Sequence, residues 1–564
     1  MKSRLFLPFL FVAAIIGFSS CSSKLNPLSS DYVKSTPQPL EVIADKIPVT
    51  IDATFPEKWF AKNATLVVTP KLKYEGGEAL GTPYTYQGEK VAGNAQVIPQ
   101  KTGANVTLRS SFDYKPEMLN KPELYLSFDA KLGKKSVQLP DVKIGEGLIA
   151  TSTLADAKTA AAAIAPDAFQ RIIKEAHTAN IQFLIQQAEL RSSELKKGEL
   201  LDWSNILTAA TQADNKEVNV EISAYASPDG GVDLNDKLAA KREKNTGDYL
   251  SKEWKKAKVS VPLTANYVAQ DWDGFKELVE KSNIQDKNLI LRVLSSYTDP
   301  VEREKQIKNI SSVYAVLADE ILPQLRRSRL TANVQIIGKS DAEIAQLASS
   351  DPKSLSVEEL LYAATLTQES AKKADIYKKV TQTYSNDYRG FNNLGAVVFE
   401  QGDIAQAESL FKKAAGLSSS SPEVYLNLGL IALTKNDIAT AEQNFGKAGN
   451  VPELKDALGV LALKKGEYNK AVSTFTTPSN NAALAQLLNK DYNKAQSTLD
   501  NVKKADATTA YLKAIVAART NNLDGVVSNL GVAIKQDRNL AKKALNDAEF
   551  VKYITNAQFL EAVK

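Results

Sequence analysis

The stretch FNNLGAVVFEQGDIAQAESLFKKAAG (391–416) decides the fold of the C-terminal part of the chain, because it recurs 34 positions later as YLNLGLIALTKNDIATAEQNFGKAGN (425–450). A third, more divergent copy keeps the 12-position step from a glycine to an alanine. A period of this length is typical of stacked helical hairpins. The positions that keep their spacing are Gly395, Ala407 and Phe411, then Gly429, Ala441 and Phe445, and then Gly459, Ala471 and Phe475.

The residue types at these positions have a packing explanation. Gly395 and Ala407 are small because two antiparallel helices cross closely there, and Phe411 is expected to fill the gap to the next repeat. Each hairpin buries its apolar face only against a neighbour, so several must stack. The period and pattern resemble tetratricopeptide repeats. That resemblance implies an α-helical solenoid over residues 352–550, with five or six units and with one or more proteins as partners; generic helical hairpins are the alternative.

The N-terminus indicates export. A basic start and an apolar run over 5–18 are the pattern of a signal peptide, here residues 1–20. The only cysteine of the chain, Cys21, follows directly. This arrangement resembles a lipobox, although Phe18 replaces the usual leucine at its start. The resemblance implies that Cys21 carries acyl chains, palmitate among them, which hold the protein at a membrane; a plain signal peptide with a chance cysteine is the alternative.

Residues 21–40 are rich in Ser, Pro, Asn and Lys and predict a flexible, lipidated tether. They lack the acidic cluster after the cysteine that resembles a surface-export signal of Bacteroidetes lipoproteins. We therefore expect an outer-membrane lipoprotein that faces the periplasm.

Composition excludes several classes of function. The chain has 70 basic and 65 acidic residues and no arginine-rich block, so nucleic acid is not an expected partner. With one cysteine and one histidine, it has no zinc site of the Cys/His type and no disulfide framework. We expect no metal, no cofactor and no enzymatic activity. An enzymatic alternative needs an acid pair hidden among Asp271, Asp273, Asp299 and Glu302.

Four segments between residues 41 and 150 alternate apolar and polar residues at the period of a half-buried strand. They are KIPVTIDATF (46–55), ATLVVTPKLKY (64–74), ANVTLRSSFDY (104–114) and ELYLSFDAKL (123–132). Short strands separated by glycine and proline predict an all-β sandwich. The alanine-rich stretch that follows predicts a linker helix over 151–166.

Residues 167–345 alternate strands and helices and predict a central α/β domain. Strands are expected at 181–186, 217–226 and 330–337, and helices at 200–210 and 238–254. The only histidine, His177, is expected on a packed or surface helix.

The central region resembles the C-terminal domain of the OmpA family. Four stretches carry the resemblance: FLIQQAELRSSEL (183–195), ISAYASPDG (222–230), NDKLAAKREKNTGDYL (235–250) and LRRSRLTANVQI (325–336). The third follows the family pattern at Asn235, Leu238, Arg242, Tyr249 and Leu250, and departs from it at Ala239, Glu243 and Thr246. The ASPDG form and a helical insertion after residue 268 resemble a Bacteroidetes branch of that family.

This resemblance implies contact with peptidoglycan. Arg242 matches the arginine that takes a diaminopimelate carboxylate in a charge-assisted pair, and Asn235 matches the family's asparagine. The aspartate that takes the amine is replaced by Ser227, and an acidic position in the first strand aligns with Leu184. Asp229 lies two positions after Ser227 and reaches the ligand only if the loop is rebuilt.

Two functions stay open at this point. In the first, a lipid-anchored periplasmic scaffold recruits proteins through its repeats and touches peptidoglycan through its OmpA-like domain. In the alternative, an assembly or secretion accessory factor uses the OmpA-like domain as a protein interface and binds no cell wall.

Overall fold

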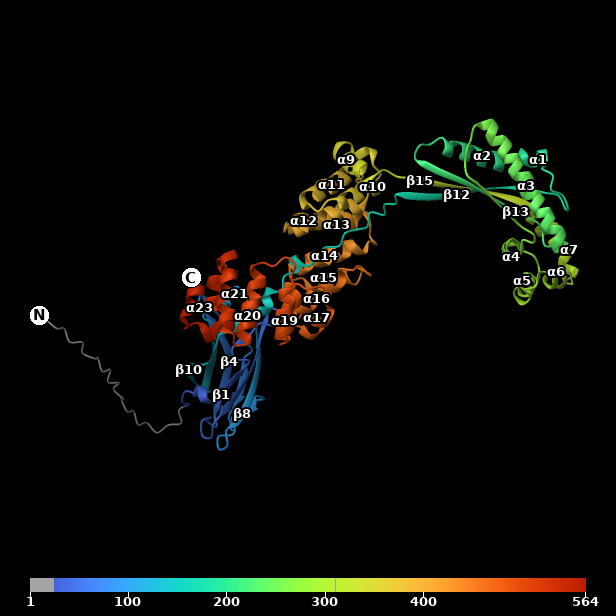
Figure 1. Cartoon of the computed structure of the whole chain (residues 1–564). Coiled ribbons are helices and arrows are strands. Elements are labelled where there is room, and N and C mark those ends of the chain that lie inside the picture. The colour runs from blue at the N-terminus through green and yellow to red at the C-terminus, as the bar shows by residue number, and fades with distance from the viewer. Residues whose placement is uncertain (1–24, 310) are drawn as a thin grey trace, which may run out of the picture. The chain divides into compact units, whose positions relative to one another are not determined.

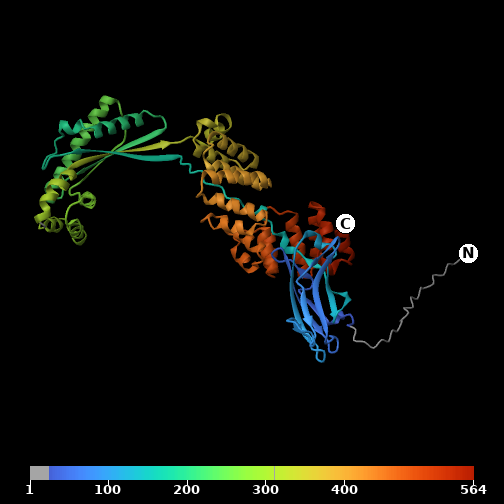
Figure 2. The ribbon, with the colours of Figure 1, turned by 180° about the vertical axis from the view of Figure 1, so that it is seen from behind.

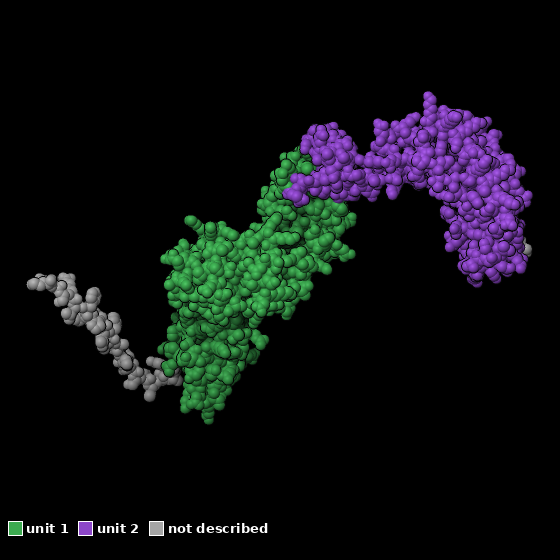
Figure 3. All heavy atoms as spheres, in the orientation of Figure 1, with its two compact units in different colours: residues 1–166, 369–564 green, residues 167–368 purple. Residues whose placement is uncertain are grey.

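The structure, a computed structural model, describes residues 25–309 and 311–564. It contains two compact units, Met1–Pro166 with Glu369–Lys564, and Asp167–Gln368 (Figure 3). The expected multidomain chain, strand-rich at the start and helical at the end, is confirmed. The signal peptide and Cys21 lie outside the described residues. Among the helices of the described ranges, none combines the length and the apolar character needed to cross a membrane.

The N-terminal strands form two sheets around one apolar core. All four predicted segments are strands, and β3 and β4 bury every second residue. Phe55 from one sheet and Tyr86 from the other meet edge to face in this core, with ring centroids 5.3 Å apart. The first sheet has the order β1 (Val33–Thr36), β3 (Lys46–Phe55), β8 (Ala104–Asp113), and the second has the order β10 (Lys135–Glu146), β9 (Glu123–Leu132), β4 (Ala64–Tyr74), β6 (Tyr84–Gln87), β7 (Gln96–Val97), with β5 (Gly77–Leu80) paired to β4.

The predicted flexible tether is wrong for residues 25–40. Leu25 and Leu28 are buried in the core of the two sheets. β1 then pairs antiparallel with β3, with Val33 opposite Ala53. Apolar burial and ladder hydrogen bonds therefore order a stretch whose composition alone favours a coil.

The predicted linker helix over 151–166 is also wrong. β2 (Leu40–Glu41) pairs with β11 (Leu148–Ile149), and the chain then makes short 3-10 turns at Thr151–Leu154 and Ala157–Thr159. The remaining residues up to Pro166 are neither helix nor strand. Alanine has the highest helix propensity, but tertiary contacts override this weak preference; the contacts are described below.

Residues 167–368 form a unit around a sheet with the order β12 (Ile172–Gln182), β15 (Arg327–Ile337), β13 (Lys216–Tyr225), β14 (Leu263–Val268). The helices α2 (Gly198–Thr211) and α3 (Val232–Ala257) pack on it (Figure 1). Trp203 from α2 and Leu250 from α3 share one apolar core with Ile222 of β13. A short helix, α1 (Ser192–Leu195), precedes α2.

Two predictions for this unit are wrong. The strand expected at 181–186 ends at Gln182, and His177 lies within that strand, β12, instead of on a helix. β12 pairs antiparallel with β15 from Ile172 opposite Ile337 to Gln182 opposite Arg327. This long-range pairing determines the strand, and a local apolar pattern does not distinguish it from a helix.

The predicted insertion is helical and has its own core, which includes Phe275 and Ile290. The unit then continues past residue 345 to Gln368, so residues 352–368 belong to it and not to the repeats. The helices of the insertion are α4 (Trp272–Lys281), α5 (Lys287–Ser296), α6 (Pro300–Lys308), α7 (Ser311–Val316) and α8 (Leu322–Leu325), and those after β15 are α9 (Asp341–Ser350) and α10 (Val357–Ala363).

The C-terminal helices stack as pairs (Figure 2). Gly395 and Gly459 lie so close to Phe411 and Phe475 of their own pairs that an added Cβ would come within 2.7–2.8 Å of the ring, and the approach at Gly429 is closer still. The phenylalanine therefore packs within its own repeat. After α11 (Ser370–Thr383), the pairs are α12 (Tyr388–Glu400) with α13 (Ile404–Leu417), α14 (Pro422–Thr434) with α15 (Ile438–Phe445), α16 (Leu454–Lys464) with α17 (Tyr468–Thr474), α18 (Asn480–Leu488) with α19 (Tyr492–Asp500), and α20 (Ala507–Arg519) with α21 (Leu523–Gln536); α22 (Asn539–Asn546) and α23 (Ala557–Ala562) follow.

Candidate functional site

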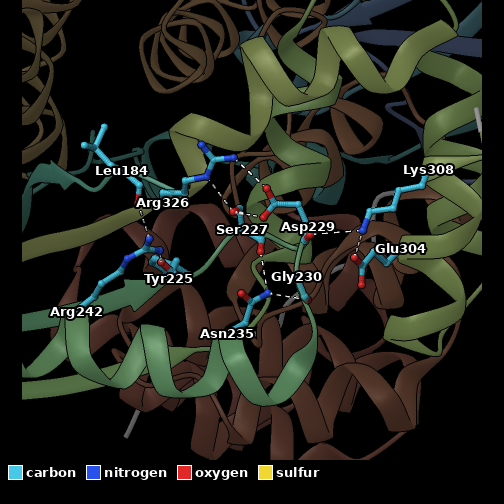
Figure 4. A network of polar contacts seen from close by, with 10 residues as sticks. All are labelled: Leu184, Tyr225, Ser227, Asp229, Gly230, Asn235, Arg242, Glu304, Lys308 and Arg326. Carbon is cyan, nitrogen blue, oxygen red and sulfur yellow. Dashed lines mark hydrogen bonds and ion pairs between the residues drawn. The ribbon is translucent and has the colours of Figure 1, made fainter. Parts of the chain in front are cut away.

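Arg242, the expected ligand-binding arginine, is buried on α3 with 1% of its surface exposed. Its guanidinium donates to three backbone carbonyls, those of Gln187 (2.9 Å), Tyr225 (2.7 Å) and Leu184 (3.2 Å). Figure 4 shows the contacts with Tyr225 and Leu184. Burial, and to a lesser degree the charge of Arg326, lowers the pKa of Arg242 to about 10. Because its hydrogen bonds go to the main chain, Arg242 holds the loop after β12 against the end of β13.

A second arginine, Arg326, lies next to the carboxylate of Asp229. The Asp229 carboxylate pairs with Arg326 at 3.0 Å and accepts a hydrogen bond from the Ser227 hydroxyl. Arg326 also donates to the Ser227 Oγ at 3.2 Å. The Asp229 carboxylate thus lies at the side chain of Ser227, and the cation that it meets is Arg326 instead of Arg242 (Figure 4).

Asn235 fixes the shape of this loop. Its side-chain amide, 4% exposed, donates to the carbonyls of Ser227 and Gly230, each at 3.0 Å. Of the predicted site residues, Ser227, Asp229 and Asn235 share this loop network, whereas Arg242 binds main-chain carbonyls outside it. The sequence reasoning missed Arg326. The only signal in the sequence was the pair of adjacent arginines at 326 and 327. In the structure, Arg326 contacts Ser227 and Asp229, and Arg327 pairs with Asp271 at 3.0 Å.

Two of the four acidic residues of the enzymatic alternative cap helices. Asp271 accepts from the Gly274 amide at the start of α4, and Asp299 accepts from the Val301 and Glu302 amides at the start of α6. N-terminal capping of this kind is a structural role.

A second polar arrangement lies along the helical repeat, where side chains of α12, α14 and α18 bind the backbone of residues 155–166. We call this face of the three helices the groove. Asn427 of α14 accepts from the Ala163 amide at 2.8 Å and donates to the Ala163 carbonyl at 2.9 Å. Asn393 of α12 does the same with Ala165, at 2.8 Å and 3.0 Å. Each asparagine therefore binds both backbone groups of one residue, as a neighbouring strand would.

A third asparagine repeats this contact further along the segment. Asn481 of α18 accepts from the Asp156 amide at 3.0 Å and donates to its carbonyl at 2.8 Å. Asn393 and Asn427 stand two positions before the repeat glycines, and Asn481 stands two positions before Ala483, which is 12 positions before Ala495. The three side chains thus occupy the same place in three repeats.

The segment carries small side chains at the positions that are buried in the groove. Ala163 and Ala165 are 0% and 1% exposed, whereas Ile164 between them is 46% exposed and faces away from the groove. Asn392 adds a bond to the Ala163 carbonyl at 3.0 Å. These contacts explain why the predicted linker helix does not form. Backbone groups that would pair with one another in a helix are paired with asparagine side chains instead.

The sequence carries a signal for this site, because Asn393 and Asn427 recur at the 34-residue repeat period. An amide side chain kept at a groove position has both a donor and an acceptor for a backbone. Their partner, an alanine-rich stretch more than 200 residues earlier, is a tertiary fact.

A buried cluster joins the end of the two-sheet region to the last repeat. The Thr151 hydroxyl donates to Glu549, whose carboxylate pairs with Arg519 at 2.6 Å. Nearby, the Tyr511 hydroxyl donates to Asp547 at 2.8 Å, and burial raises the pKa of Asp547 to about 6. These contacts explain why residues 41–150 and the repeats, expected as separate domains, form one compact unit.

Comparisons with known proteins find similarity to solved structures. No protein-family model and no curated protein sequence matches the chain. A tetratricopeptide repeat protein from Parabacteroides merdae is 12% identical, with 40% of this chain and 90% of that chain covered and a TM-score of 0.28. Pseudomonas aeruginosa pilF is 16% identical, with 38% of this chain and 99% of that chain covered and a TM-score of 0.27. YrrB, described as a TPR protein with an unusual peptide-binding site, is 15% identical, with 36% of this chain and 100% of that chain covered and a TM-score of 0.21. Since these TM-scores are low, the fold assignment rests on the chain's own helix pairs.

Proposed function

We propose that this protein is a non-enzymatic scaffold that is anchored by lipid at Cys21 to the outer membrane, faces the periplasm, and binds an extended segment of a partner protein in the groove of its helical repeat. One observation carries the proposal: Asn393, Asn427 and Asn481 each bind both backbone groups of one residue of an extended chain. Main-chain hydrogen bonds give affinity for a strand-like peptide, and the side-chain pockets give specificity.

Purification from detergent-solubilised membranes tests the proposal. We expect a protein to copurify with the wild-type chain and to be lost with the double variant Asn393→Ala, Asn427→Ala. The control is Asn469→Ala on the exposed side of α17, which should retain the partner. Identical sets of proteins from all three chains would rule out binding through the groove.

The anchor has a separate test. Cys21→Ala should move the protein from the membrane fraction to the soluble periplasmic fraction, because the acyl chains attach to that sulfur. A variant that stays with the membrane would contradict lipid anchoring and would leave the groove proposal untouched.

A second candidate function is contact with peptidoglycan through Asp229 and Arg326. The observation that favours it is an ion pair of opposite charges, 3.0 Å apart, at the loop that the OmpA resemblance assigns to the ligand. An aspartate and an arginine match the amine and the carboxylate of diaminopimelate. We expect the full chain to sediment in part with purified sacculi and the double variant Asp229→Ala, Arg326→Ala to stay in the supernatant, with Lys241→Ala as the control. Equal sedimentation of the three chains would leave the alternative, a protein interface without wall binding.

A further inference from the structure

The groove of the helical repeat is already filled by the chain itself. We propose that residues 155–166 are an intramolecular ligand of this groove, and that a partner chain binds the asparagines only after it displaces them. The inference rests on the proposed function, since it concerns access to the same groove.

The groove asparagines also bind one another. Besides its two bonds to Ala163, Asn427 donates to the Oδ1 of Asn392 at 2.9 Å, and Asn392 donates to the Oδ1 of Asn393 at 3.1 Å. All three side chains are buried, with at most 1% of their surface exposed. A second chain therefore cannot reach the buried groups that bind Ala163 and Ala165 while these two residues are in place.

Covalent attachment gives the resident segment an advantage over a free peptide. The segment is held just upstream by the Thr151 bond to Glu549 and by the Ser152 bond to the Val42 carbonyl at 2.6 Å. A short tether gives an effective concentration of about millimolar. A peptide that makes the same contacts competes poorly below that concentration, so a natural partner must make further contacts outside the groove.

The contacts also define the chemistry of the partner segment. Its backbone must be extended, and it must carry small side chains at two positions that are two residues apart, because Ala163 and Ala165 are fully enclosed. The type of the residue between them is not restricted by the groove, since Ile164 is 46% exposed. The partner segment is thus a small-x-small stretch of an extended protein chain.

The test measures binding of a fluorescent synthetic peptide with the sequence of residues 155–166 to the mature full chain. In the linker variant Ala163→Glu, Ala165→Glu, bulky charged side chains should expel the resident segment and leave the groove open. We expect the dissociation constant for the peptide to be at least about tenfold lower than for the wild type, in line with the loss of an intramolecular competitor. Asn427→Ala added to the linker variant should abolish this gain.

A matched control lies between the two altered positions. Ile164→Glu changes the exposed residue of the same segment and should bind the peptide as weakly as the wild type. A wild-type chain that binds the peptide as tightly as the linker variant would overturn the intramolecular ligand and leave the proposed protein binding intact. Hydrogen exchange shows whether the segment is released in the linker variant. If it is released and the variant still binds no peptide, the groove is not a binding site.

A second measurement does not depend on the folding of the linker variant. In the chain with a wild-type linker, Asn427→Ala should accelerate hydrogen exchange of the Ala163 amide about tenfold, with a smaller effect at Ala165. If the Ala163 amide of the wild type exchanges as fast as an unprotected loop amide, the segment does not occupy the groove.

Discussion

The side-chain amide of Asn427 binds both the amide and the carbonyl of Ala163, a residue 264 positions earlier in the chain. This pair joins the segment that leaves the two-sheet region to the second helix pair of the repeat. It explains at once why an alanine-rich stretch is not a helix and why two regions distant in sequence fold as one unit.

Asn427→Ala should therefore destabilise the fold. It leaves the buried Ala163 amide without a partner, while the Ala163 carbonyl keeps only the bond from Asn392. An unpaired buried group of this kind costs about 1–3 kcal/mol. We expect the free energy of unfolding in urea to fall by about 2 kcal/mol or more, with Asn469→Ala unchanged. Equal midpoints for the two variants would show that Ala163 finds other partners.

Gly429→Leu should disturb the crossing of α14 and α15. An added Cβ at this position would overlap the Phe445 ring, and overpacking of this kind costs about 1–3 kcal/mol. Gly416→Ala on α13, where an added Cβ meets no atom within 4 Å, is the control and should be neutral or slightly stabilising. A thermal melt of the full chain distinguishes them, and an unchanged melt for Gly429→Leu would contradict the close contact.

Arg242→Ala should lower stability. The OmpA resemblance implies a ligand-binding role for Arg242, but its buried guanidinium donates to three backbone carbonyls. Removing it takes one hydrogen bond from each of those carbonyls and opens a cavity, so we expect a loss of about 3 kcal/mol. Arg242→Lys should not restore the loss, since an ammonium lacks the planar fork. The exposed neighbour Lys241→Ala should have no measurable effect on urea unfolding; an equally small effect of Arg242→Ala would contradict the structural role.

Asp547 should make stability fall as pH rises. Burial raises the pKa of its carboxyl to about 6 in the folded protein, above the value of about 3.9 in an unfolded chain. Between these values the folded state binds more protons than the unfolded state, so its contribution is present at about pH 4 and is lost as pH passes 6. Relative to wild type, Asp547→Asn should gain about 2–3 kcal/mol between pH 4 and 7 in urea unfolding. Parallel pH profiles of the two proteins would refute this.

The sequence by itself determined the local elements. The period of the repeats placed the close contacts of Gly395 and Gly429, since a repeated glycine marks a crossing wherever the hairpins stack. Period-2 patterns placed β3 and β4 at their observed bounds, because alternation along one strand depends only on which face is buried.

Only the tertiary structure decided which distant groups meet. Leu25 and Leu28 enter a core in a stretch that composition marks as a coil, and Arg326 instead of Arg242 takes the Asp229 carboxylate. The alanines of 155–166 favour an α-helix locally, but three asparagines of the repeat bind the backbone of Asp156, Ala163 and Ala165 instead. Helix propensity differs by less than about 1 kcal/mol per residue, so a few buried hydrogen bonds supplied from more than 200 positions away reverse it.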